Sequence, residues 1–360
     1  MSRSTLSALL IAAAASTYVF AQPDPADPTP LYSKHYAYPS AIPYQVDYNT
    51  AAIRGPQVGY NICNGTTENQ QSMCQTSFVN HLDDFCLWAP SKPNSTIADT
   101  EQEEIAWCTK KGHGTRVMPE GTLQGVQYLK MKDYIQITGF IKQENVNMAT
   151  GDYGGELDPH GADLRGNPLG GLMYSNVYPS SNTDNSTYTQ VSDWTNFMGG
   201  DAFCIKICDP SSQNKGSNCE NRYDRVGCAY NAPNNAQNGT FEVCDADDVL
   251  PVGTYVSGGA TLTWTQPPDG VEPNPPYTPT PPASSNCVKY QSAQLYTDAV
   301  KPTSTGSGSQ PTGGSGSGSS SGSGSSGSGS GSGGSNGASS MTVSAITGLA
   351  GVAFAMAIFA

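Results

Sequence analysis

The chain has 360 residues, of which 17 are Lys or Arg and 30 are Asp or Glu, so its formal net charge is −13 at pH 7. This acidic balance excludes a nucleic-acid-binding protein, because such a protein needs a cationic surface against the phosphates. Between the two low-complexity ends lie about 220 residues, which is enough for one domain with a sizeable core.

The N-terminal residues predict export from the cell. A basic residue precedes a short apolar run, and Ala21 ends an acceptable small-residue cleavage site, so residues 1–21 are predicted to be a signal peptide. Residues 22–43 are rich in Pro and Asp and are expected to form a flexible arm. Residues 44–265 are expected to form a disulfide-bonded, β-rich ectodomain.

The cysteines agree with an extracellular location. An even number of cysteines in an exported chain predicts disulfides, and this chain has ten: Cys63, Cys74, Cys86, Cys108, Cys204, Cys208, Cys219, Cys228, Cys244 and Cys287. Sequence alone does not select the pairing. The simplest arrangement has two pairs within the first group of four, two pairs within the second group, and Cys287 linked back to the second group. A zinc site at Cys204, Cys208, Cys219 and Cys228 is the alternative, but its spacing is not a standard ligand pattern.

Strand signals dominate the folded part. Residues 122–130 and 133–141 alternate apolar and polar side chains around a short turn, which predicts an antiparallel pair. Residues 254–264 predict a hairpin, because Gly258 and Gly259 supply the positive φ angles of a tight turn.

Other segments are shorter or less regular. Residues 203–207 and 227–230 are expected to form short strands that carry cysteines, and residues 96–107 a helix with an acidic first turn. Residues 151–171, rich in Gly, Asp and Pro, predict loops. The fold class predicted is mainly β, either β-sandwich-like or a β-dominated α+β fold, disulfide-rich and with disordered termini.

Four Asn-x-Ser/Thr sequons predict exposed loops that carry N-glycans. They begin at Asn64, Asn94, Asn185 and Asn238. Ser and Thr residues between 278 and 340 are candidates for O-glycosylation, as in stalk segments.

Two loops hold the candidates for chemistry. His113 and Arg116 lie in one, and Glu156, Asp158 and His160 lie in the other. Two histidines with carboxylates suit a metal ion or acid/base work if the loops meet at one end of the sheet. The structural alternative is that Asp158 starts a turn and that the carboxylates of this loop pair with Arg116 and Arg165.

Other chemistry has weaker support in the residues. Glu101, Glu103 and Glu104 could supply a glycosidase acid/base pair, but on one helix they would mostly face water. The sequence has no hydrolase elbow, zinc-protease helix or phosphate-binding loop. No catalytic residue, metal or cofactor is therefore assigned. The 19 tyrosines against 9 phenylalanines favour sugar stacking as an alternative function.

The C-terminal quarter has four parts. Residues 266–283 form a Pro-rich spacer, residues 284–298 a strand expected to dock back on the ectodomain, and residues 299–336 a Gly/Ser-rich stalk. Residues 337–360 end in an uncharged apolar run, which is typical of a glycosylphosphatidylinositol (GPI) attachment signal. Asn336 is the predicted attachment residue, and the neighbouring small residues back to Gly334 are nearly equivalent.

Several longer motifs occur at Thr96–Glu101, Ala106–Thr109, His113–Arg116, Gly154–Asp163, Trp194–Met198, Phe203–Asp209 and Gly239–Cys244. Together they resemble a known family, the immunoreactive mannoproteins of basidiomycete yeasts, which also includes the macrophage-activating glycoproteins of mushrooms. The resemblance implies a GPI-anchored, mannosylated surface protein whose glycans are recognised by host lectins and T cells. It implies no established enzymatic activity. The Gly/Ser stalk departs from the Ser/Thr-rich stalks of that family.

The sequence thus predicts a GPI-anchored cell-surface and cell-wall mannoprotein with a structural and glycan-display role. Its predicted partners are cell-wall polysaccharide, host mannose-binding lectins and the plasma membrane, the last through the GPI anchor. The alternatives are a cell-wall carbohydrate-binding module and a hydrolase centred on His113 and His160.

Overall fold

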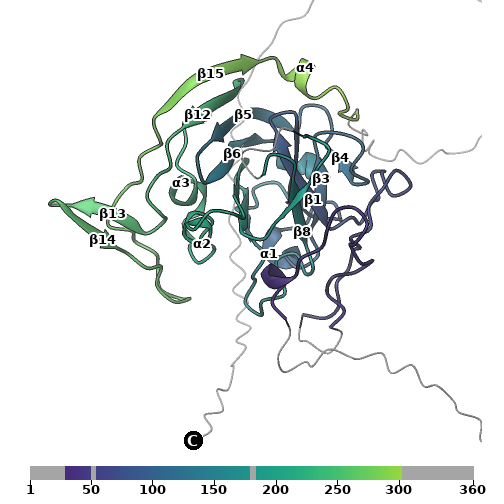
Figure 1. The fold of residues 1–360 in the computed structure, drawn as a ribbon, viewed down its shortest axis with the longest axis horizontal. Helices are drawn as coiled ribbons and strands as arrows, with labels where there is room; N and C mark the ends of the chain where they lie inside the picture. The colour runs from purple at the N-terminus through teal and green to yellow at the C-terminus, as the bar shows by residue number, and fades with distance from the viewer. Residues whose placement is uncertain (1–28, 50–53, 179–183, 302–360) are drawn as a thin grey trace, which may run out of the picture. The chain divides into compact units, whose positions relative to one another are not determined.

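The fold is built from two mixed β-sheets, which confirms the mainly β prediction (Figure 1). The computed structural model describes residues 29–49, 54–178 and 184–301. The predicted signal peptide, residues 302–336 of the predicted stalk and the GPI signal lie outside these ranges, as does Asn336. None of the helices in the described ranges is long and apolar enough to cross a membrane.

The first sheet has six strands in the order β4-β3-β2-β1-β8-β9. The pairs β1/β8 and β3/β4 are parallel, and the others are antiparallel. The strands are β1 (Thr76–His81), β2 (Asp84–Ala89), β3 (Ile105–Cys108), β4 (Arg116–Val117), β8 (Leu172–Ser175) and β9 (Thr189–Val191).

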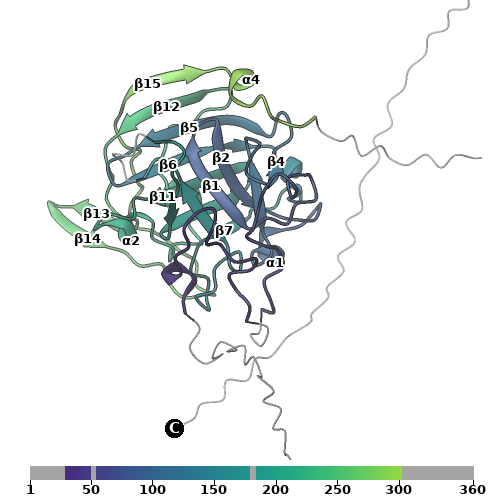
Figure 2. The same cartoon turned by 45° about the vertical axis from the view of Figure 1, so that its right-hand side comes forward.

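The second sheet has seven strands in the order β15-β12-β5-β6-β11-β10-β7. Only β12/β5 is parallel within it. Figures 1 and 2 show β15 and β12 side by side along one edge of this sheet. The strands are β5 (Leu123–Lys130), β6 (Tyr134–Ile141), β7 (Gly155–Leu157), β10 (Trp194–Gly199), β11 (Ala202–Cys208), β12 (Phe241–Ala246) and β15 (Ser284–Tyr290).

The remaining elements are short. The predicted hairpin is present as β13 (Thr254–Ser257) and β14 (Ala260–Thr263), with Gly258 and Gly259 at φ of 58° and 81° in its turn. The helices are η1 (Leu31–Ser33), α1 (Ile97–Thr100), η2 (Gln143–Val146), α2 (Lys215–Asn218), α3 (Gly227–Asn231) and α4 (Ser292–Leu295).

The two sheets pack face to face through aromatic side chains, as in a β-sandwich. The rings of Phe85 on β2 and Phe203 on β11 stack with centroids 6.1 Å apart, and Trp88 and Trp194 lie 5.9 Å apart. The Trp88 amide also donates to the Asn196 side chain. One buried cluster therefore contains apolar residues of both sheets.

A third layer of loops covers the outer face of the second sheet. Side chains alternate along a strand, so Phe203 and its alternate neighbours face the core while Cys204, Lys206 and Cys208 face outward. Lys206 Nζ donates to a backbone carbonyl of α2 and lies 4.9 Å from the Tyr134 ring centroid. Burial lowers the pKa of Lys206 to about 8. This layer is therefore packed like an interior.

Five disulfides brace the fold in the arrangement that the grouping of the cysteines predicts. The pairs are Cys63–Cys74, Cys86–Cys108, Cys204–Cys228, Cys208–Cys219 and Cys244–Cys287. Two of them fasten the outer loop layer to β11, and the last joins β12 to β15. All four cysteines of the alternative zinc site are thus oxidised and cannot offer thiolates.

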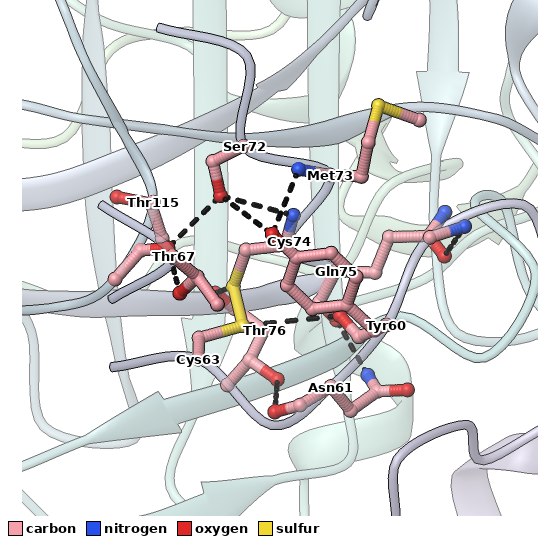
Figure 3. The surroundings of a disulfide bond; sticks show 12 residues. Tyr60, Asn61, Cys63, Thr67, Ser72, Met73, Cys74, Gln75, Thr76 and Thr115 are labelled. Carbon is pink, nitrogen blue, oxygen red and sulfur yellow. Dashed lines mark hydrogen bonds between the residues drawn. A yellow bond between two sulfur atoms is a disulfide. The ribbon is translucent and has the colours of Figure 1, made fainter. Parts of the chain in front are cut away.

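Figure 3 shows how polar contacts support the first of these disulfides. The Gln75 amide donates to the Tyr60 carbonyl at 2.7 Å, and the Thr76 hydroxyl donates to the Asn61 carbonyl at 2.9 Å. The Met73 amide donates to the Tyr60 hydroxyl. The loop that carries Cys63 is therefore held to β1 by backbone and side-chain bonds as well as by sulfur.

Three predicted elements differ from the structure. The predicted helix at 96–107 ends at Thr100, because residues 105–108 form β3, which pairs with β2 and is tied to it by a disulfide. Residues 227–231 form α3 rather than a strand. The predicted loop at 151–171 contains β7, which pairs with β10.

Parts of the predicted arm and of the C-terminal segments lie against the domain. Leu31 is buried, and the Tyr38 ring meets the Phe78 ring edge-on at 5.4 Å. In the Pro-rich segment, the Tyr277 hydroxyl accepts a bond from the Gly253 amide. The Val300 carbonyl accepts from the Glu120 amide, so the chain remains docked to its last described residues.

Candidate functional site

His113, the first predicted site residue, is buried in a structural pair. Its Nε2 lies 2.6 Å from Asp84 Oδ1, and its ring stacks on Phe78 with centroids 4.1 Å apart. Asn80 donates a second hydrogen bond to Asp84 at 3.0 Å. Burial alone would raise the pKa of Asp84, but the bonds from His113 and Asn80 and the charge of His113 outweigh it and lower that pKa. The Asp84–His113 pair is thus satisfied within the fold.

Arg116 is also committed to the fold. Its Nε donates to the Ser72 carbonyl at 3.0 Å and its Nη1 to the Ser91 carbonyl at 2.9 Å, while the guanidinium lies 5.1 Å from the Trp107 ring centroid. Burial lowers the pKa of Arg116 to about 10. The prediction that loop carboxylates pair with Arg116 is wrong, since within the described residues it makes no ion pair. The Arg165 part of that prediction is correct, because Arg165 pairs with Asp163 at 3.7 Å.

The loop after β7 is pinned by the turn that the sequence predicts. Asp158 Oδ1 accepts bonds from the backbone amides of His160 at 2.6 Å and Gly161 at 3.0 Å. His160 stacks on Tyr32 with centroids 4.6 Å apart. Its Nδ1 lies 3.5 Å from Asp158 Oδ1, which is too long for a strong hydrogen bond. Both candidates therefore help to hold the loop.

Glu156 differs from the other candidates. It is 6% exposed, and neither carboxyl oxygen has a hydrogen-bond partner among the residues that the structure describes. Burial raises the pKa of Glu156 well above its ordinary value, and the neighbouring Asp158, Asp224 and Glu220 raise it further. A buried carboxyl without partners is costly to the fold, so it needs a physical explanation.

The position of Glu156 on its strand explains which way it faces. Glu156 pairs with Phe197 on β10, and Phe197 pairs with Cys204 on β11. Directly paired residues point to the same side of a sheet, so Glu156 lies on the outer face. Its neighbours along β7 face the other way, and Leu157 is part of the core.

A cavity of about 820 Å³ opens on this face. Its walls come from α1 and the turn after it, from β7 and its flanking loops, from the β10–β11 turn, and from the segment between α2 and α3. Glu156 and Phe197 line it, together with Asp158, Glu101 and Asp224. Burial raises the pKa of Glu101 too. The cavity thus places several carboxyl groups beside the apolar ring of Phe197.

Tyr153 stands at the cavity with 94% of its surface exposed. The backbone on either side of it is fixed by Asp152, whose carboxylate accepts bonds from the Ile97 and Gly154 amides and whose carbonyl accepts from the Gly200 amide. Gly154 has φ of 79°, and a Cβ there would lie 1.4 Å from the Met198 carbonyl oxygen. The exposed ring is therefore carried by a rigid backbone.

The structure divides the predicted site residues into two groups. Asp158 and Glu156 line the cavity and His160 lies beside Asp158, whereas His113 and Arg116 belong to a separate network around Asp84 and Ser72. No hydrogen bond, ion pair or ring contact joins the two groups among the residues described.

The sequence did not predict the exposed position of Tyr153 at the cavity or the pairing of Asp84 with His113. It also placed Glu104 toward water, whereas Glu104 is fully buried and accepts a bond from the Thr100 hydroxyl at 2.6 Å. The turn after α1 carries it inward. The glycines that flank Tyr153 were the available signal for a close backbone approach.

Among the described residues, one group of three ligating side chains lies close enough to hold a metal ion: Glu242, Cys244 and Cys287. Both sulfurs of this group are joined in a disulfide. They are therefore poor ligands, since metals bind the thiolate.

The fold and its five disulfides define a class: a disulfide-braced β domain of the kind found in exported proteins. The chain is 42% identical to appressorium protein ROW1 of Mycosarcoma maydis over 232 residues, which are 64% of this chain and 51% of ROW1. It is 38% identical to appressorium protein ROW2 of the same fungus over 259 residues, which are 71% of this chain and 82% of ROW2.

The chain therefore belongs to the family of the fungal proteins ROW1 and ROW2. It spans about half the length of ROW1. No protein-family model matches the chain, and no solved structure matches it.

Proposed function

We propose that this protein is a glycan-bearing scaffold of the fungal cell surface, held to the plasma membrane by a GPI anchor and embedded in the cell wall. Its finer class would be that of the mannoproteins that its motifs resemble. ROW1 and ROW2 are named as appressorium proteins, and the proposal carries that setting to this chain. The partners are wall polysaccharide and, through the glycans, mannose-binding lectins of a host.

The observation that carries the proposal is the exposure of every sequon. The side chains of Asn64, Asn94, Asn185 and Asn238 are all exposed, and all four lie outside helices and strands. An oligosaccharide is bulky and hydrophilic, so only such positions accept one without disturbing the core.

The sequon loop at Asn64 is also well ordered by local bonds. Asn64 Oδ1 accepts from the Thr66 amide at 2.9 Å and from the Thr66 hydroxyl at 2.7 Å. Asn64 follows Cys63, whose disulfide ties this loop to the start of β1. A glycan at Asn64 would thus be presented from a braced position, which suits a display role.

The structure favours a scaffold over the alternative hydrolase centred on His113 and His160. His113 is occupied by Asp84 and Phe78, and His160 lies against Tyr32 and Asp158. A general base must reach a proton on the substrate, and a buried His113 whose Nε2 is bonded to Asp84 offers little such reach.

Mass spectrometry of the native protein tests the proposal. We expect N-glycans on the sequon asparagines and release of the protein from membranes by a phosphatidylinositol-specific phospholipase. Replacing Asn64 by Gln should remove one glycan, whereas replacing the exposed Asn69, which begins no sequon, should remove none. A native protein with neither glycan nor lipid would contradict the proposal.

A further inference from the structure

We infer that the cavity beside β7 is a binding site for a neutral oligosaccharide, with Tyr153 as its stacking platform and Glu156 as the polar group at its floor. This goes beyond the proposed scaffold role, because it assigns a ligand to the folded domain itself. It does not depend on the glycans or the anchor.

The volume suits a small ligand. Ligand cavities usually measure about 300–1,000 Å³ and place a few polar groups in an otherwise apolar wall. This cavity of about 820 Å³ falls in that range. Phe197 contributes apolar surface, and Asn167 and Asn221 contribute amide groups.

Glu156 supplies the observation that points to a ligand. It is more than nine-tenths buried, it lines the cavity, and both its carboxyl oxygens lack partners among the described residues. In its protonated form a carboxyl group offers one O–H donor and remaining acceptor sites. A sugar hydroxyl is likewise both a donor and an acceptor, so one hydroxyl can satisfy the acid that the fold leaves unpaired.

Tyr153 supplies the complementary apolar contact. A tyrosine ring offers an apolar face and a polar tip, which matches the C–H face and hydroxyl rim of a pyranose. Its 94% exposure leaves the ring open to a ligand. Because Asp152 and Gly154 fix the backbone, little conformational entropy of the main chain is lost on binding.

The charges of the cavity argue against other ligands. Glu101, Asp158 and Asp224 would repel a phosphate or a carboxylate ligand. Among the described residues these carboxyl groups do not form one of the close clusters that a metal ion requires. Arg225 lines the cavity, but both of its Nη atoms donate to carbonyls of the Pro-rich segment, including that of Val271 at 2.9 Å, and its Nε lies 3.8 Å from Asp269.

Calorimetric titration of the full-length protein tests the inference. The ligands are short β-1,3-gluco-, chito- and manno-oligosaccharides. We expect saturable binding of at least one series. Tyr153→Ala should weaken binding about five- to tenfold, and Glu156→Leu at least about tenfold. Glu156→Gln keeps a donor and an acceptor and should bind within about threefold of the parent protein.

Two controls keep the test specific. Tyr44→Ala removes a tyrosine that is 61% exposed away from the cavity, and it should leave binding unchanged. If Glu156→Leu fails to fold, Tyr153→Ala still tests the inference, because an exposed ring contributes little to stability and this variant should fold. Absence of binding by all three series, or binding that survives Tyr153→Ala, would overturn the inference, as would binding of Ca²⁺ alone that depends on Glu156.

Discussion

Asp84 and Glu156 are two carboxyl groups of nearly equal burial, 7% and 6% exposed, with opposite surroundings. Asp84 begins β2 in the first sheet and receives hydrogen bonds from His113 and Asn80. Glu156 lies on the edge strand of the second sheet and receives none from the described part of the chain. Partners lower the pKa of the first group, and burial raises the pKa of the second.

The comparison separates a structural acid from a candidate binding group. A buried polar group with its bonds satisfied stabilises the fold and leaves nothing for a ligand. A buried polar group without bonds destabilises the fold, and carboxyl groups whose pKa is strongly raised, as that of Glu156 is, concentrate at functional sites. The His113 network is therefore assigned to stability, and the Glu156 cavity to recognition.

The largest expected effect is that of Asp84→Ala. Removing the Asp84 carboxylate leaves the buried His113 ring nitrogen and the Asn80 amide without their hydrogen-bond partner, so the free energy of unfolding should fall by about 3 kcal/mol at neutral pH. Urea unfolding measures the loss. The neighbouring Asp83, whose side chain is 43% exposed and pairs with Lys110 at 3.7 Å, is the control, and Asp83→Ala should cost less than about 1 kcal/mol.

The effect of Asp84 has a definite pH dependence. Its pKa is lowered in the folded state, so its contribution is present above the unfolded pKa of about 3.9 and is lost as the pH falls through the folded pKa. The difference in the free energy of unfolding between the parent protein and Asp84→Ala should therefore shrink as the pH is lowered. If this stability difference were constant down to strongly acidic pH, Asp84 would stabilise the fold only through packing and not through its charge.

The next effect concerns the backbone that presents Tyr153. Gly154→Ala should destabilise the fold by about 2 kcal/mol more than Gly151→Ala. Both glycines have positive φ, but a Cβ at Gly154 collides with the Met198 carbonyl whereas a Cβ at Gly151 meets nothing within 4 Å. Thermal unfolding of the two variants measures the difference. Equal costs would show that the close approach at Gly154 does not constrain this segment.

Glu156→Gln should stabilise the protein. Because the pKa of Glu156 is raised in the folded state, the parent protein loses stability as the pH rises from the unfolded pKa toward the folded one. The variant lacks this loss, so it should be more stable by about 1.5 kcal/mol near pH 5.5 and equal to the parent below about pH 4. Gln in place of the exposed Glu272 is the control and should change nothing. A destabilised Glu156→Gln would mean that the carboxyl has a partner after all.

The smallest effect is expected for Tyr153→Ala. Its ring is almost fully exposed, so stability should change by less than about 0.5 kcal/mol. The buried Tyr128 donates from its hydroxyl to the Asn80 carbonyl at 2.8 Å, and Tyr128→Phe should cost about 1 kcal/mol. Chemical unfolding of both variants tests this order, which would be wrong if Tyr153→Ala were the more damaging change.

Local patterns predicted the parts of the fold that depend on neighbours in sequence. The alternation in residues 123–141 and the Gly258-Gly259 turn define antiparallel pairs that are present in the structure. The helix at 96–107 shows the limit of such reasoning. Thr96 does cap a helix, but residues 105–108 are drawn into a sheet by β2 and by Cys86, which are remote in sequence.

The cavity could be predicted only in part. Glu156 and Asp158 were candidates by composition, but composition cannot distinguish a satisfied acid from an unsatisfied one. The partner that occupies His113 is Asp84, 29 residues away in the chain. The exposure of Tyr153 depends on contacts between two strand ends, which no local pattern contains.

The most direct test of the comparison is site-resolved titration of the two carboxyl groups by carbon NMR, from acid to neutral pH. The structure predicts that Asp84 ionises below its ordinary range and that Glu156 remains protonated well above its own. Glu156 ionising together with the exposed carboxyl groups would contradict the account, because an ionised and solvated Glu156 would not be the unpaired group on which the binding site is built.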